Sequence, residues 1–480
     1  MVRAFSTVAP GPAATAATIA AGSVPRVRAE SSDHPAFDAF VAEIFERLPR
    51  ADQRRWAHVY TRGLLMTPGR KTVRRLAASV SDSATAAQAL HQFVNASPWD
   101  WEPVRARLAD WVVRRSRPRA LLLGTAVLPK RGDRSCGVHR RFVPQEGRTV
   151  NCQVGIGAFL AADRATVPVD WRLLLPGSWS ADPQVRDRAR VPEDAAGTQD
   201  SAAVQALDLV DGVDLSRAGT GAGADLDGVP VVADLVGFAD TVALTAGLAA
   251  RGRRFVVAVP GDLVVLADRA GAGVSGVPGV SGVSQVSGVS GAAGTNRVPG
   301  AHGVFAPSGG FAGVSGAGAL PGRPAGGGVT VRSLVAAHDA RVPGRPPGAP
   351  VLPVRLPGVP VPLRLTVERR PDEAGRDRFW LTDLVDRPAR ETPALARLHT
   401  GAADTMKRLA DDFGLRAFEG RSYPGWHHHM TLVSAAFAYG ALGRAGTPPT
   451  HPARASRGPQ PGRPPRRART STTPTRTGRP

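Results

Sequence analysis

The sequence predicts an α/β protein in which an all-helical N-terminal region precedes a mixed sheet. Before about residue 117, apolar residues recur at spacings of three and four, which is the period of an amphipathic helix. After Pro118, short apolar runs bounded by Gly, Pro and Asp are typical of buried strands. A strand–helix–strand unit follows, so part of the sheet is expected to be parallel.

Composition divides the 480 residues into ordered and low-complexity segments. The chain has 54 Gly and 43 Pro, too many for a wholly globular protein. The Val-Ser-Gly repeats after Ala270 have almost no charge and no apolar face, so a flexible insertion is predicted there. The predicted segments are a disordered leader or misplaced start (1–35), a helical domain (36–117), the first part of the α/β core (118–268), a low-complexity insertion (269–362), a hairpin, helix and remaining core (363–445), and a disordered Arg/Pro tail (446–480).

Five helices are predicted in the first domain. Pro49 and Pro68 end the first two, because proline cannot continue a helix. The predicted helices span about 37–48, 56–64, 73–80, 84–94 and 99–112. Arg70, Lys71 and Arg74 cluster near the third, and they form either a solvated helix face or a patch that contacts phosphates.

The core is predicted from strands and one connecting helix. Strands are expected at 120–127, 136–143, 151–160, 167–175, 229–233 and 254–260, with a helix at 241–252. Two alternating runs, 363–370 and 378–384, form a predicted hairpin.

Residues 402–430 combine an acidic helix with a basic segment. Met406, Leu409 and Phe413 give the predicted helix one apolar stripe, and Gly414 is expected to end it. The segment Arg421–Met430 that follows is aromatic, basic and rich in His, and a loop is predicted there. Acidic residues beside such a loop suit a site that holds metal ions and handles phosphates.

Charge favours a polyanionic partner. The formal net charge is +21 and the pI is near 11.4, which is typical of proteins that bind nucleic acid. Nearly all of this charge is Arg, which GC-rich coding DNA also produces, so part of it reflects codon usage. Two cysteines are too few for a disulfide framework and fit a reducing cytoplasm. No stretch approaches the roughly 20 apolar residues that span a bilayer, so no membrane is expected.

Individual motifs leave several alternatives open. Asp234 ends a predicted strand and is either a metal ligand or a turn residue. Cys136, His139 and Cys152 lack the paired spacing of a structural zinc site. The sequence contains no dinucleotide fingerprint, phosphate-binding loop or nucleophile elbow.

Several separated motifs, in order, resemble bacterial insertion-sequence transposases of the DDE superfamily, in the branch common in GC-rich actinobacteria. The motifs are Leu128-Pro-Lys-Arg-Gly132, Ser135-Cys-Gly-Val-His139, Arg148-Thr-Val-Asn-Cys-Gln153, Pro168-Val-Asp-Trp-Arg-Leu-Leu-Leu-Pro176 and Phe418-Glu-Gly-Arg-Ser-Tyr-Pro-Gly-Trp-His-His-His429. The resemblance covers roughly 37–433 apart from the repeats. It implies a ribonuclease-H-like core, a helical DNA-binding domain at 36–117, double-stranded DNA ends and target as substrates, and a homodimer.

The resemblance also implies a reaction. Enzymes of this superfamily use three carboxylates, Asp, Asp and Glu, to hold two Mg²⁺ or Mn²⁺ ions for strand cleavage and joining. Nearby Arg and Lys neutralise the charge that develops on the phosphate. The candidate DNA contacts are Arg70, Lys71 and Arg74 of the basic cluster, and Lys130, Arg131, Arg421, Trp426 and His427 of the motifs that carry the resemblance.

The catalytic positions match the family incompletely. The first Asp belongs within 122–126, where the chain has no carboxylate. The second falls on Asp234. The third belongs near Ala402 or Ala403, and Asp404 is one position away.

Two functions follow from this match. In the first, the chain is a DNA transposase in which Asp234 and Asp404 bind Mg²⁺, and Asp133 or Asp170 replaces the missing carboxylate. Asp170 has the alternative of pairing with an arginine. In the second, the chain is a catalytically inactive, transposase-derived DNA-binding protein or a pseudogene product, and the Val-Ser-Gly expansion favours this reading.

Overall fold

The computed structural model describes residues 35–144, 146–195, 201–213, 228–267, 328–341, 350–369 and 377–443. The predicted leader, the Val-Ser-Gly repeats and the Arg/Pro tail lie outside these residues.

The five predicted N-terminal helices are confirmed. They are α1 (Pro35–Ile44), α2 (Ala51–Met66), α3 (Val73–Val80), α4 (Ala86–Asn95) and α5 (Glu102–Ser116). Their apolar stripes point inward: Ile44, Leu64 and Leu76 are fully or almost fully buried. Helix α5 ends where Arg117 adopts a left-handed conformation, just before Pro118.

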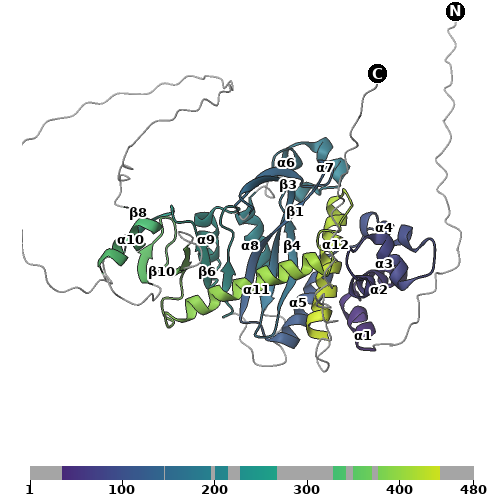
Figure 1. The fold of residues 1–480 in the computed structure, drawn as a ribbon, viewed down its shortest axis with the longest axis horizontal. Helices are drawn as coiled ribbons and strands as arrows, with labels where there is room; N and C mark the ends of the chain where they lie inside the picture. The colour runs from purple at the N-terminus through teal and green to yellow at the C-terminus, as the bar shows by residue number, and fades with distance from the viewer. Residues whose placement is uncertain are drawn as a thin grey trace, which may run out of the picture.

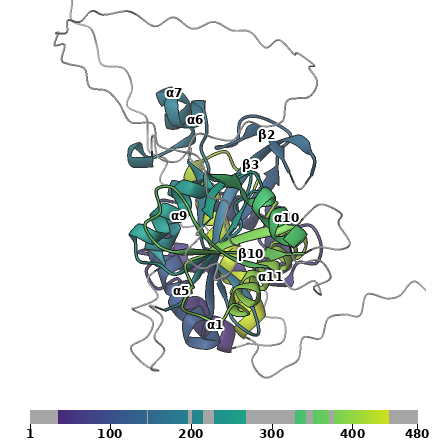
Figure 2. The same ribbon diagram turned by 90° about the vertical axis from the view of Figure 1, so that its left-hand side faces the viewer.

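The next strands form one end of a large mixed sheet. Strand β3 (Arg148–Ala161) is the longest, and β1 (Ala120–Pro129) pairs antiparallel along one side of it. On its other side β3 pairs first with β2 (His139–Val143) and then with β4 (Thr166–Leu173). Figure 2 shows β2 near α6 (Ser178–Ala181) and α7 (Pro183–Ala189), at the opposite end of the molecule from α1.

A parallel unit occupies the middle of the sheet. Strand β5 (Val231–Ala233) lies between β1 and β6 (Phe255–Val259) and runs parallel to both. Helix α9 (Thr241–Ala250) makes the crossover, and the Asp240 carboxylate caps it by accepting hydrogen bonds from the backbone N–H groups of Val242 and Ala243. The predicted strand–helix–strand unit is therefore confirmed.

Antiparallel strands complete the sheet. The predicted hairpin is present as β10 (Leu363–Glu368) and β11 (Arg378–Thr382), and β11 pairs with β6. Strands β9 (Val351–Arg355), β7 (Val264–Ala267) and β8 (Val329–Thr330) follow outward. Strands β8 and β9, with helix α10 (Val331–Arg341), lie within 269–362, so described parts of this segment are ordered although composition alone assigned them to the insertion.

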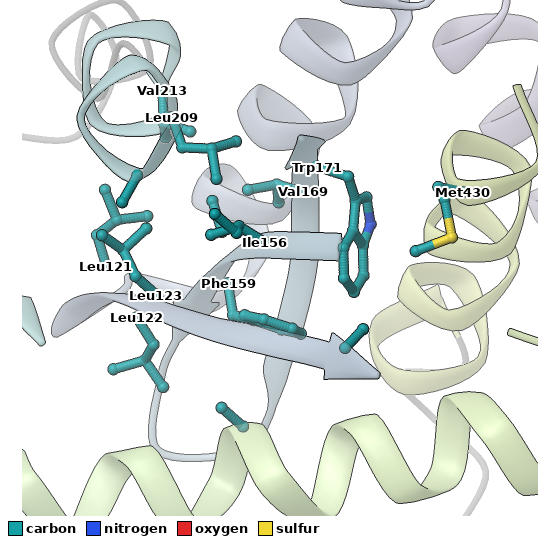
Figure 3. Packing of buried hydrophobic residues seen from close by; sticks show 14 of the residues in the cluster. Leu121, Leu122, Leu123, Ile156, Phe159, Val169, Trp171, Leu209, Val213 and Met430 are labelled. Carbon is teal, nitrogen blue, oxygen red and sulfur yellow. The ribbon is translucent and has the colours of Figure 1, made fainter. Parts of the chain in front are cut away.

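Helices cover both faces of the sheet (Figure 1). The long helix α11 (Glu391–Asp411) crosses one face, against β1, β3, β4, β5 and β6. Helix α8 (Ala202–Gly212) packs on the other face. Figure 3 shows Leu121 and Leu123 directed toward Leu209 of α8, and Leu122 directed toward α11. This mixed α/β fold is the ribonuclease-H-like class that the resemblance implies.

The prediction of a loop at Arg421–Met430 is wrong. Helix α12 (Tyr423–Ala438) begins there, capped by the Ser422 hydroxyl, which accepts a hydrogen bond from the Gly425 N–H. Pro424 lies in its first turn, where proline is tolerated. The helix is buried on all sides because it packs between β4 and the helices α2, α4 and α5, and it continues into a π-helical turn at Tyr439–Gly443.

Candidate functional site

A cavity of about 380 Å³ lies at the end of β5, between β1 and α11. We call it the strand-end cavity. Crevices at the carboxyl ends of parallel strands are common ligand sites in α/β sheets. It is lined by Gly124, Thr125, Ala126, Val127, Val143, Glu146, Phe159, Asp234, Arg378, His399, Ala402, Ala403, Met406, Lys407, Ala410, Asp411, Leu415 and Arg416.

Asp234 is held in this cavity by an ion pair. Its Oδ2 atom lies 3.0 Å from Nη1 of Arg378, which reaches across from β11. The Asp234 side chain is only 13% exposed, and a buried charge needs a partner. The Arg378 guanidinium provides that partner. The residue that a two-metal site would use as a ligand is therefore already neutralised by a protein cation.

His399 of α11 lies beside the same carboxylate. Its Nδ1 atom is 4.0 Å from Asp234 Oδ2, too far for a direct hydrogen bond. Burial lowers the pKa of His399, and the charge of Asp234 opposes this shift only in part. Its Nε2 atom is buried and has no hydrogen-bond partner in the described part of the chain. The ring is therefore neutral near pH 7 and has an unused polar atom.

The positions expected for the other two carboxylates hold small residues. Gly124 of β1 lies in the strand where the first Asp belongs, and Ala402 and Ala403 lie at the third position. A Cβ atom added at Gly124 would be 3.8 Å from His399 Nε2, an ordinary contact, so there is room for a side chain. The structure thus brings the three expected positions around one cavity. Asp234 supplies a carboxylate at the second position, whereas the first and third hold Gly and Ala.

Asp404 is not brought to Asp234. The cavity is lined by positions 399, 402, 403, 406, 407, 410 and 411 of α11, most of which lie on one helical face. Asp404 is rotated about 100° from Ala403, is exposed, and is not among the lining residues. The assumption that one step along the sequence is a small displacement does not hold on a helix.

The remaining carboxylates do not complete a metal site. Glu146 and Asp411 line the cavity but pair with Arg148 at 2.7 Å and Lys407 at 2.6 Å. No group of three His, Cys, Asp or Glu side chains that could hold a metal occurs among the described residues. The donor set of the strand-end cavity therefore does not fit a pair of Mg²⁺ or Mn²⁺ ions.

The two substitute carboxylates lie elsewhere. Asp170 Oδ1 is 2.8 Å from Arg105 Nη1 and 3.2 Å from Arg172 Nη1, which confirms the alternative that it pairs with arginine. Asp133 is exposed and lines a separate hollow with Trp179. Neither lines the strand-end cavity.

Cys136 and Cys152 are free and buried. Burial raises the pKa of the Cys136 thiol to about 12. His139 pairs with Cys152 across β2 and β3, but its Nδ1 atom lies 3.0 Å from the Gly137 carbonyl oxygen. The His139 Nδ1 atom is therefore occupied by a backbone contact.

A second hollow of about 620 Å³ adjoins the strand-end cavity and shares Ala410, Asp411 and Arg416 with it. We call it the basic groove. It brings together Arg70, Lys130 and Arg131, which are far apart in sequence. Its lining is Gly69, Arg70, Lys71, Thr72, Pro129, Lys130, Arg131, Gly132, Ser135, Ala410, Asp411, Gly414, Arg416, Ala417, Phe418 and Glu419.

The two lysines of the groove have structural partners. Lys71 is 6% exposed, and its ammonium group donates to the carbonyl oxygens of Leu64 and Thr67 at the end of α2. Lys130 donates to the Phe418 carbonyl oxygen at 2.7 Å, and burial lowers its pKa to about 8. Lys130 therefore links the motif at 128–132 to the motif at 418–429, and Lys71 satisfies carbonyl oxygens at the C-terminal end of α2.

Other expected DNA contacts are separated from the groove. Trp426 and His427 are 0% and 1% exposed, so their side chains lie in the core and not on a surface. Helix α12 buries them because it packs on all sides. Arg421 is exposed beside Asp133, and Arg74 is exposed on α3 outside the groove lining.

Sequence reasoning missed Arg378, His399 and Arg416. His399 shares the helical period of Ala402, Ala403 and Met406, so a helix predicted to begin earlier would have included it. Arg378 had no comparable signal, because its role depends on β11 pairing next to β6.

Comparison with known families agrees with this architecture. Residues 43–276 match the family model described as DDE superfamily endonuclease. The match includes Gly124, Asp234 and the Lys130 loop but ends before α11. No curated protein matches the chain. No described helix is both long and apolar enough to cross a membrane. The family match, together with the ribonuclease-H-like fold, supports a DDE-type transposase family for this chain.

Proposed function

We propose that the chain is a transposase-derived protein that binds double-stranded DNA and does not cleave it by two-metal catalysis. The observation that carries this proposal is the strand-end cavity, where Gly124, Ala402 and Ala403 surround one carboxylate that is paired with Arg378. A two-metal reaction needs anionic ligands that fix both cations and balance their charge. One neutralised Asp234 cannot do so.

The basic groove supports DNA binding. Arg70 and Arg131 are exposed and line it. Arg416 is exposed at its junction with the strand-end cavity. Guanidinium groups donate hydrogen bonds to phosphate oxygens in a planar fork, which suits them to a nucleic-acid backbone. The proposed contacts are these three arginines, with Arg74 and Arg421 as outlying exposed positions.

The second candidate is an active transposase that uses Mg²⁺ or Mn²⁺. The match to DDE superfamily endonucleases favours it. In that case Asp234 would have to exchange Arg378 for a cation and recruit further ligands when DNA binds.

Metal-dependent stabilisation and cleavage separate the two candidates. The protein would be melted with and without Mn²⁺, and duplex DNA would be incubated with wild type and Asp234→Ala. A cation that binds the native state raises the melting temperature. Because the proposed protein has no two-metal site, we expect Mn²⁺ to cause no shift in melting temperature and no DNA cleavage. A Mn²⁺-dependent shift or cleavage that Asp234→Ala abolishes would establish the active enzyme instead.

The groove itself is tested by the salt dependence of duplex binding. The logarithm of the association constant falls linearly with the logarithm of the salt concentration. We expect Arg131→Ala to make this slope less steep by about one, since one phosphate contact is lost. Arg164→Ala is the matched control, because Arg164 is an exposed arginine of the turn between β3 and β4 and lies outside the groove lining. Equal slopes for both variants would remove the groove from the DNA interface.

A further inference from the structure

The strand-end cavity has the character of a ligand site despite its missing carboxylates. Its volume of about 380 Å³ falls within the range of small-molecule sites. Val127, Phe159 and Met406 give it apolar walls, and Asp234, Arg378 and His399 supply a few converging polar groups. The small residues at the former ligand positions enlarge the space.

The polar groups of the cavity are incompletely used. His399 Nε2 is buried without a hydrogen-bond partner in the part of the chain that the structure describes. An unpaired buried polar atom is unfavourable, so a ligand that supplies a partner gains affinity. One oxygen of the Asp234 carboxylate forms the ion pair with Arg378, and a carboxylate can accept several hydrogen bonds.

The cavity adjoins the basic groove. The two hollows share Ala410, Asp411 and Arg416. A phosphate backbone held by Arg70 and Arg131 would therefore run past the mouth of the cavity, with Arg416 at the junction. Nucleic-acid bases would be the apolar, hydrogen-bonding groups nearest to this opening.

We propose that the strand-end cavity receives an unpaired nucleobase of DNA bound in the basic groove. This inference rests on the proposed DNA-binding function. The flat base would pack against Val127 and Met406, which are partly exposed in the cavity, as extruded bases pack on aromatic and apolar side chains. An exocyclic amino group would donate to Asp234, and a ring nitrogen or carbonyl group would pair with His399 Nε2. Adenine, cytosine and guanine have such an amino group, so they are preferred over thymine.

Two variants fill the cavity from opposite walls. Ala403→Leu extends from an exposed position of α11. Gly124→Val extends from β1, where an added Cβ makes only ordinary contacts at 3.8 and 3.9 Å. Thr400→Leu is the matched control, because position 400 is exposed on the same helix and does not line the cavity. None of the three changes the charge.

The test compares two duplexes without divalent metal, one perfect and one with adenine opposite an abasic site. Wild type is expected to bind the second at least about tenfold more tightly, because the unpaired base costs little to extrude. Ala403→Leu and Gly124→Val should reduce this preference to about onefold and leave perfect-duplex binding unchanged, whereas Thr400→Leu should keep it. Thymine in place of adenine should also reduce it.

Each result decides between the proposal and its failure. No preference in wild type, or a preference that survives both filling variants, would overturn the base site even if perfect-duplex binding persists. If the wild type does not bind the perfect duplex, the proposed DNA-binding function itself is overturned. Binding of free adenosine monophosphate, lost in Ala403→Leu, without any preference between duplexes would assign the cavity to a free nucleotide and overturn the strand-bound source.

Discussion

The strand-end cavity and the buried face of α12 both gather titratable residues, but one is hollow and the other is filled. In the cavity, His399 Nε2 has no partner among the described residues and Gly124 leaves space beside it. On α12, His428 has one ring nitrogen 2.8 Å from the Val94 carbonyl oxygen and the other 2.8 Å from that of Trp99. Its ring also stacks on Trp99 at 3.9 Å.

The same contrast holds for the ion pairs of the two regions. Arg105 is 3% exposed and donates to Asp170, to Thr431 and to the carbonyl oxygens of Trp171 and His427. It therefore ties α5, β4 and α12 together. Arg378, by contrast, is 37% exposed and pairs with Asp234 at the cavity wall. Both ring nitrogens of His427 on α12 also lack a partner among the described residues, so an unpaired nitrogen alone does not separate the two regions. Filled space marks the structural cluster, and unused space marks the candidate site.

The largest expected effect comes from breaking the saturated pair. Asp170→Ala should lower the free energy of unfolding by about 3–5 kcal/mol, because it leaves the Arg105 charge buried without its partner. Asp234→Ala should cost about 1 kcal/mol or less, because water can reach Arg378. Urea denaturation of both variants measures the difference. Equal losses would contradict the assignment of Asp170 to structure and Asp234 to the site.

Much of the fold could be predicted because its signals are local. The apolar periods of α1–α5 and the runs of β1, β3 and β6 predicted these elements close to their observed bounds. Helix α12 was missed because its sequence, with three consecutive His and a Pro, carries no amphipathic period. Only its burial on all sides explains the helix, and that burial depends on helices far away in sequence.

The candidate site was predictable in part. Asp234 at a strand end and the vacancy at Gly124 could be read from the resemblance. The pairing of Asp234 with Arg378 could not, because it depends on which strand lies beside β6. Which of Ala403 and Asp404 faces the cavity could not be predicted either, because it depends on how α11 is rotated against the sheet.

A second prediction uses pH to challenge the packed region. Burial lowers the pKa values of His428 and His429 to about 4, and that of His427 well below its ordinary value. Between about pH 6.5 and pH 4 the unfolded chain binds more protons at these positions than the folded chain. Stability should therefore fall as pH decreases through this window, by roughly 3 kcal/mol for each of His428 and His429.

Urea midpoints measured from pH 7 to pH 4 check this dependence. His429→Gln should flatten the curve. Its amide can replace one of the two ring contacts, which are to Tyr60 Oη at 3.0 Å and to the Gly414 carbonyl oxygen at 3.1 Å. An unchanged slope in this variant would mean that His429 is not a source of the pH dependence.

The smallest expected effect compares two glycines that face each other across β1 and β3. Gly124 and Gly157 are register partners, and neither has a positive φ. A Cβ at Gly157 would lie 2.7 Å from Trp171 and 2.9 Å from Phe159, so Gly157→Ala should cost about 1–3 kcal/mol through overpacking. A Cβ at Gly124 enters the cavity at 3.8 Å or more, so Gly124→Ala should leave stability unchanged or raise it by up to about 1 kcal/mol. Thermal melts of the two variants test whether the hollow beside Gly124 exists in solution, since a destabilised Gly124→Ala would mean that this strand is packed as tightly as its partner.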